Sequence, residues 1–292
     1  MLTQPFMQHA FLAGTAIAVA AGLVGCFLVL RGQVFTADAL SHVAFTGALA
    51  ALAFGIDARL GLFALTVAVA IGLAGLGTAG RPDDTVIGAV FAWVLGLGVL
   101  FLSTYTAHRG GSNGSGAVAV LFGSVLGLSS SRALLAAAVA LAVSLVLLVL
   151  ARPLLLSTVD ERVARAGGVP VRLLGVAFLA LTGVTAAEAS QVVGALLILG
   201  LVAAPAGAAT LLTANPYKAL ALSAGIAVGA VWGGLTASYL IPKTPPSFAI
   251  TSLAAAAFGG AAVVRRLRTR HLAGADAIRE DASHRTIEEQ TR

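Results

Sequence analysis

Long apolar runs recur along the whole chain, and they limit what it can fold into more than any other feature. A helix needs about 20 predominantly apolar residues to cross the hydrocarbon core of a bilayer. Charges and turn residues divide the sequence into about nine such runs, near residues 10–30, 34–55, 59–79, 85–104, 132–151, 171–187, 191–212, 219–240 and 247–264. The pattern predicts an all-α membrane protein, a polytopic helical bundle of about 8–9 transmembrane helices.

Composition excludes a soluble domain and several other classes. Of the 292 residues, 59% are hydrophobic and 10% are charged, whereas a soluble domain carries about 25% charged residues. The formal net charge of +6 does not indicate nucleic-acid binding, because the basic residues flank apolar runs and no aromatic-basic groove accompanies them. The single cysteine, Cys26, excludes an internal disulfide and a thiolate metal cluster.

Arginines indicate how the spans are oriented. One group flanks a single loop and another follows the last run: Arg152, Arg162, Arg165 and Arg172, then Arg265, Arg266, Arg268 and Arg270. Cytoplasmic loops are enriched in Lys and Arg, so both groups are expected inside. Alternate threading then places the N-terminus outside and the C-terminus inside. We expect a transmembrane domain over residues 1–264 and a cytoplasmic mixed-charge tail over 265–292 that is partly helical or disordered.

Asp38 and His42 stand four residues apart inside one of the runs. On a helix this spacing puts both side chains on one face, with Cβ atoms about 5–6 Å apart. An aspartate at bilayer depth costs about 2.5–3.5 kcal/mol, so it needs a partner or a watery path. An oxygen and an imidazole nitrogen suit Zn²⁺ or Mn²⁺. Two alternatives stay open: a structural pair with the imidazole hydrogen-bonded to the carboxylate, and a proton relay.

Two stretches between the runs are polar. The segment 105–116 is a glycine-rich loop, and the apolar segment 117–128 after it is too short to span, which favours an interfacial or re-entrant helix. In the loop 152–171, Thr158 with Glu161 three residues later can cap a short helix that ends at Gly167 or Gly168. A short amphipathic helix there is a natural docking element, and a solvated linker is the alternative.

The order of motifs resembles one family, the permease subunits of ATP-binding-cassette (ABC) importers for zinc and manganese. The matching residues are Gln8–Gly14, Leu30-Arg31, Asp38–His42, Asp84–Gly88, Leu121–Gly123, Asp160–Val171, Val193–Leu197, Pro205-Ala206, Ser238-Tyr239 and Pro245-Pro246. Each motif is weak alone, but together they cover the chain to about residue 260. The resemblance implies the type II ABC importer permease fold.

The resemblance also implies roles for individual residues. Asp38 and His42 are expected to hold the metal in transit, and Pro205 to break a span beside the pore. Glu188, expected at the turn between two spans, is either a metal ligand at the outer mouth or a solvated acid. The coupling helix that contacts the ATPase is expected at Asp160–Gly168. The residues expected to couple it to the ATPase are Asp160, Glu161, Ala164, Gly167 and Gly168.

The implied partners follow from the same resemblance. They are a cytoplasmic ATPase, an extracytoplasmic metal-binding protein, a second permease copy or close homologue, and the lipid of a bacterial cytoplasmic membrane. The sequence has no G-x-x-x-x-G-K-[ST] loop, so the chain is expected to be a transport subunit and no enzyme. Zn²⁺ or Mn²⁺ is the expected cargo, with Fe²⁺ as a further candidate and no permanent cofactor. The competing hypotheses are a secondary cation or proton transporter or channel, and an ABC permease for iron chelates or cobalamin.

Overall fold

The fold is that of a helical membrane protein. A computed structural model describes residues 4–78, 80–108, 127–192, 194–195, 198–241 and 243–290, without the side chains of residues 108, 192 and 270–290. Its helices are α1 (Pro5–Leu30), α2 (Val34–Ala53), α3 (Ala58–Leu76), α4 (Asp84–His108), α6 (Ser130–Val159), α7 (Glu161–Ala166), α8 (Val171–Val192), α9 (Ile198–Leu212), α10 (Pro216–Leu240) and α11 (Pro246–Gln290). Residues 105–108, expected in the polar loop, belong to α4. Residues 109–126, which include most of the expected loop and Leu121–Gly123, lie outside the described residues.

Eight of these helices are long and apolar enough to cross a membrane, which confirms the predicted bundle of 8–9 helices. The expected span 191–212 is wrong in its first part. There α8 continues to Val192 and the next helix, α9, begins only at Ile198. Gly194 between them has φ +93°, a conformation that an α-helix cannot contain. With 15 residues, α9 is about 22 Å long and too short to cross unaided.

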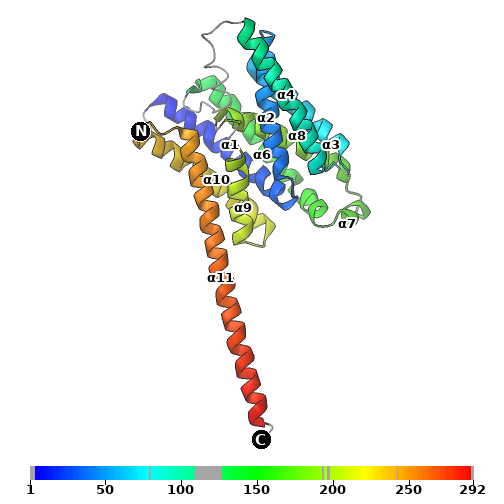
Figure 1. Cartoon of the computed structure of the whole chain (residues 1–292), viewed down its shortest axis with the longest axis vertical. Coiled ribbons are helices and arrows are strands. Elements are labelled where there is room, and N and C mark those ends of the chain that lie inside the picture. The colour runs from blue at the N-terminus through cyan, green and yellow to red at the C-terminus, as the bar shows by residue number, and fades with distance from the viewer. Residues whose placement is uncertain are drawn as a thin grey trace.

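The first helix, α1, forms the centre of the bundle. It packs against α6, α8, α9 and α10, and Figure 1 shows it surrounded by these helices. Gly25 permits the closest of these contacts, because a Cβ atom there would lie 2.1 Å from the carbonyl oxygen of Val202 in α9. Large apolar side chains such as Leu141, Leu145 and Val149 of α6 point outward, as expected for a surface that faces lipid.

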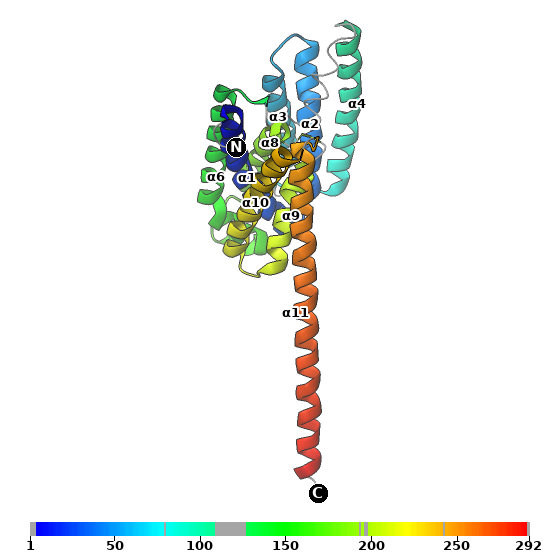
Figure 2. The ribbon, with the colours of Figure 1, turned by 90° about the vertical axis from the view of Figure 1, so that its left-hand side faces the viewer.

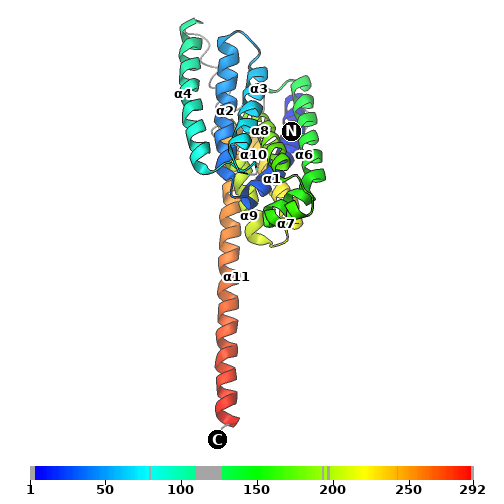
Figure 3. The ribbon, with the colours of Figure 1, turned by 90° about the vertical axis from the view of Figure 1, so that its right-hand side faces the viewer.

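Connections alternate between the two ends of the bundle. The α2–α3 turn and the end of α4 lie at one end, whereas α7 and the α9–α10 turn lie at the other (Figures 2 and 3). The extension of α11 leaves the bundle on the α7 side. Both arginine groups therefore lie at the same end, as the threading of the spans from the sequence requires.

The tail is more regular than expected. The sequence predicted a partly helical or disordered segment after Arg265, but α11 runs from Pro246 to Gln290 as one helix. The reason is that the segment contains neither proline nor any other strong helix breaker apart from Gly274. Since the helix crosses residue 264 without a break, the division into domains at 264/265 stays a prediction.

Candidate functional site

The start of α2 positions Asp38 and His42. Gly32, with φ +65°, turns the chain between α1 and α2, and Gln33 is the N-cap of α2. Asp38 and His42 are both half-buried, whereas the residues between them, Ala39 to Ser41, are buried. The pair therefore occupies the one stripe of this part of α2 that is not fully packed.

Helix α4 covers one side of this stripe. The His42 ring lies 5.1 Å from the ring of Phe91 in an edge-to-face arrangement, and Phe91 also contacts Phe35 at 5.9 Å between ring centroids. Within the described residues no hydrogen bond joins the Asp38 carboxylate to the His42 imidazole. The alternative in which the His42 imidazole is hydrogen-bonded to the Asp38 carboxylate is therefore not seen in the structure.

Ser41, inside the same motif, connects α2 to the segment before α9. Its hydroxyl donates to the carbonyl oxygen of Asp38 at 2.7 Å and to that of Ala195 at 2.9 Å, and the residue is fully buried. The sequence analysis missed this residue. Its signal was present, because a serine buried at membrane depth needs a hydrogen-bond partner.

Glu188 is not at a turn between spans, and this part of the sequence prediction is wrong. It lies in the last turns of α8, which ends at Val192 and not at residue 187. The residue is only 2% exposed, and its Oε1 accepts a hydrogen bond of 3.1 Å from Arg59 Nη2 in α3. Gln191 donates to Oε2 at 3.2 Å. Because both oxygens have partners, Glu188 is no solvated acid, and Arg59 is a partner that the sequence analysis missed.

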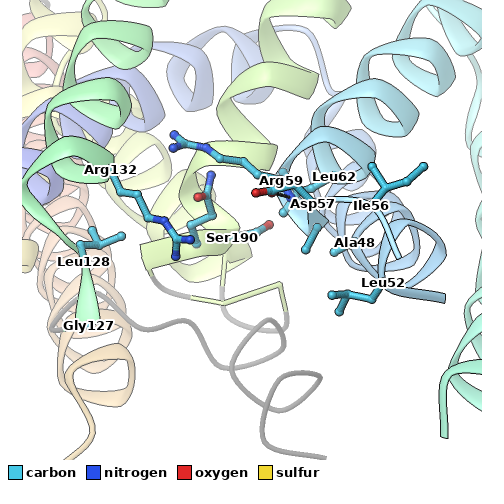
Figure 4. A pocket seen from close by; sticks show the side chains of 12 residues that line it. Ala48, Leu52, Ile56, Asp57, Arg59, Leu62, Gly127, Leu128, Arg132 and Ser190 are labelled. Carbon is cyan, nitrogen blue, oxygen red and sulfur yellow. Dashed lines mark hydrogen bonds between the residues drawn. The ribbon is translucent and has the colours of Figure 1, made fainter. Parts of the chain in front are cut away.

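A pocket of about 530 Å³ opens beside Arg59 at the end of the bundle opposite α7. Figure 4 shows Arg59 and Asp57 from the start of α3 and Arg132 from α6 on opposite sides of this pocket. Its apolar wall comes from Ala48, Leu52, Ile56, Leu62 and Leu128. The charged residues at this mouth are therefore two arginines and one aspartate, and Arg59 is already paired with Glu188.

Helix α7 forms where the coupling helix was expected, but its cap differs. The Asp160 carboxylate accepts hydrogen bonds from the backbone of Arg162 at 2.8 Å and of Val163 at 3.0 Å. Thr158 was the expected cap, but it lies within α6 and donates to the Leu154 carbonyl. Asp160 is the better N-cap because it directly precedes the first helical residue.

The far end of α7 matches the prediction. Gly167 is the C-cap, and Gly168 has φ +78°, which ends the helix in the left-handed conformation. Within α7, Ala164 is fully buried, whereas Val163 is 55% exposed. On the outer face Glu161 forms an ion pair with Arg165. One side of α7 thus packs on the bundle, and the other presents charge and an apolar side chain to solvent.

Pro205 does not break a helix. It is buried inside α9, which continues from Ile198 to Leu212, so the predicted break is wrong in position. The discontinuity lies before α9, where Gly194 has a positive φ. A proline removes a single backbone donor, and the helix on both sides of Pro205 retains its remaining hydrogen bonds.

The comparisons with known proteins decide the family. A profile described as ABC 3 transport family matches residues 3–265. The chain belongs to this family. The manganese transport system membrane protein MntC of Halalkalibacterium halodurans is 30% identical over 236 residues, which cover 80% of this chain and 79% of that protein. The manganese import system permease protein ScaB of Streptococcus parasanguinis is also 30% identical over 236 residues, covering 80% of this chain and 82% of that protein.

A solved structure has a similar fold. PsaBC from Streptococcus pneumoniae in complex with Fab has 25% sequence identity and a TM-score of 0.77, covering 89% of this chain and 92% of that chain. The predicted fold and family are therefore confirmed. The roles of Asp38, His42, Glu188 and the α7 residues stay predictions.

Proposed function

We propose that this ABC 3 family protein is the permease of an ABC importer and passes Mn²⁺ through the bacterial cytoplasmic membrane. The half-buried pair of Asp38 and His42 on α2 carries the proposal. The relatives named as manganese transport proteins support Mn²⁺ as the cargo. Oxygen and imidazole ligands suit Mn²⁺, and they also suit Zn²⁺ and Fe²⁺.

The ligand set of one chain is incomplete, and this suits a site of transit. Among the described residues no group of three His, Cys, Asp or Glu side chains is placed to hold a metal ion. A complete, closed coordination shell would bind too tightly for release. Two copies of the chain, or one copy and a homologue, would bring two Asp-His pairs to a shared pathway.

Energy would come from a separate ATPase, because the sequence contains no phosphate-binding loop. The exposed side of α7, with Val163 and the Glu161–Arg165 pair, is suited to contact that subunit. An extracytoplasmic binding protein would deliver the ion at the opposite end, where Arg59 and Arg132 flank the pocket. Family membership argues against a secondary transporter, and the named manganese relatives favour a bare ion over an iron chelate or cobalamin.

The decisive experiment is uptake of radioactive Mn²⁺ into vesicles that contain the permease with its ATPase and binding protein. We expect Asp38→Ala and His42→Ala each to abolish uptake, while the protein still inserts and still co-purifies with the ATPase. Asp84→Ala and His9→Ala are matched controls from other helices and should import normally. Competition by Zn²⁺ and Fe²⁺ establishes the preferred ion. Normal uptake in both α2 variants would refute the transit site.

A further inference from the structure

The guanidinium group of Arg31 is buried with two of its three nitrogens unpaired. The residue is 9% exposed, and its Nε donates to Gln33 Oε1 at 3.2 Å. Its Nη1 and Nη2 have no hydrogen-bond partner within the part of the chain that the structure describes. The group lies over the Phe178 ring of α8, 5.1 Å from the ring centroid. Leaving two donor nitrogens of a buried cation without a hydrogen bond is costly, so we expect a second state in which an acceptor pairs with them.

Among the described residues, no carboxylate is hydrogen-bonded to the Arg31 guanidinium. Gln33 Nε2 and Arg81 Nε are buried and unpaired among the described residues. Burial, helped by the positive charge of Arg81 and opposed by the carboxylate of Glu161, lowers the pKa of Arg31 to about 10. Arg81 is held in place by a hydrogen bond of 2.7 Å from its Nη2 to the Ser157 carbonyl in the last turn of α6. This cluster, which we define as Arg31, Gln33 and Arg81, is built to receive an anion.

Glu161 follows Ser157, whose carbonyl oxygen holds Arg81 of the cluster, by four residues. It is the first residue of α7, and in this structure it pairs with Arg165 one turn further on. The side chains of Glu161 and Arg165 are 33% and 61% exposed. An exposed pair of this kind contributes little stability, so exchanging its partner costs little.

We propose that the Arg31 cluster receives the Glu161 carboxylate, which exchanges Arg165 for Arg31 when the ATPase displaces α7. The inference rests on the proposed function, since it requires an ATPase bound at α7. Arg31 caps the end of α1 and Gln33 caps the start of α2. Occupation of the cluster therefore repositions the first turn of α2, and Asp38 lies in the next turn. The exchange links movement of α7 to the helix that carries Asp38 and His42.

The test measures Mn²⁺ imported per ATP hydrolysed by the reconstituted complex. Arg31→Gln and Glu161→Gln should each lower this ratio about tenfold, within the usual range of coupling between sites. The double variant should be no worse than either single variant, because both remove the same interaction. The charge exchange Arg31→Glu with Glu161→Arg should restore part of the ratio. Arg152→Gln, at an exposed position of α6, is the control and should keep the ratio of the unaltered protein.

Three results would overturn the exchange. The first is additive losses in the double variant, and the second is no recovery of the ratio on charge exchange. The third is a normal ratio in Glu161→Gln while Arg31→Gln is impaired. That result would indicate that Arg31 binds another anion, such as a carboxylate of the ATPase. Should Arg31→Gln fail to fold, Glu161→Gln decides alone, because its side chain is partly exposed. An unaltered complex that hydrolyses ATP without importing Mn²⁺ would contradict the proposed function instead.

Discussion

Ser41 of α2 donates a hydrogen bond of 2.9 Å to the carbonyl oxygen of Ala195, and it thereby fixes α2 to the segment that precedes α9. The contact joins residues 154 positions apart in the sequence. Ser41 lies between Asp38 and His42 in the sequence, so we expect a movement of the segment before α9 to displace both side chains. The structure thus connects two discontinuous elements at the centre of the proposed transit site.

Replacing Ser41 by alanine should destabilise the protein by about 1 kcal/mol, the usual worth of one hydrogen bond inside a membrane protein. The Ala195 carbonyl would lose its donor in a buried setting. Thermal unfolding of the detergent-solubilised protein measures the effect. Ser103→Ala, at an exposed position of α4, is the control and should leave the unfolding temperature unchanged.

Replacing Arg59 or Glu188, the two partners of an ion pair, should destabilise the protein to different extents. Arg59→Ala leaves a carboxylate that is 2% exposed without its cation, and loss of a buried partner costs about 3 kcal/mol. Glu188→Gln leaves Arg59, which is 23% exposed and can reach water, so its cost should be smaller. Combining the two changes should recover stability relative to Arg59→Ala, as measured by unfolding temperature.

Transport kinetics separate this role from a metal ligand at the outer mouth. If Glu188 serves only Arg59, then Glu188→Gln should leave the half-saturating Mn²⁺ concentration unchanged. A clear increase in that concentration, in a variant that folds normally, would support Glu188 as a ligand instead.

Gly47 and Gly61 set the distance between α2 and α3. A Cβ atom at Gly47 would lie 2.3 Å from the Gly61 carbonyl oxygen, so Gly47→Ala forces the two backbones apart. We expect a loss of about 1–3 kcal/mol, as for other overpacked sites. Gly72→Ala on α3 meets no atom within 4 Å, and this control should be neutral or slightly stabilising. Equal unfolding temperatures for both variants would contradict the close contact.

Asp160→Ala should weaken the start of α7. It removes the acceptor of two backbone hydrogen bonds, and the loss of an N-cap costs about 1 kcal/mol. Since α7 has only six residues, we expect reduced co-purification with the ATPase, whereas Asp160→Asn, which still caps, should bind normally. Binding of both variants like the unaltered protein would argue against α7 as the contact.

Much of the architecture was predictable because the signals are local. Apolar runs of span length, arginines at their ends and the spacing of Asp38 and His42 depend only on nearby residues. The main error in the helix boundaries, at 187–198, arose because one apolar stretch conceals the left-handed Gly194. The cap of α7 was misplaced because Thr158 and Asp160 both precede the helix in sequence, and only one can occupy the N-cap position.

The sequence alone determined the class of fold and the shared face of Asp38 and His42, since helical periodicity fixes which neighbours project together. Only the tertiary structure decided that Glu188 pairs with Arg59, 129 residues away, and that Ser41 bonds to Ala195. It also decided that two nitrogens of the buried Arg31 have no hydrogen-bond partner among the described residues. These contacts depend on which helices lie side by side and at what rotation. All spans carry similar apolar side chains on their surfaces, so the sequence of one helix does not specify which other helix it packs against.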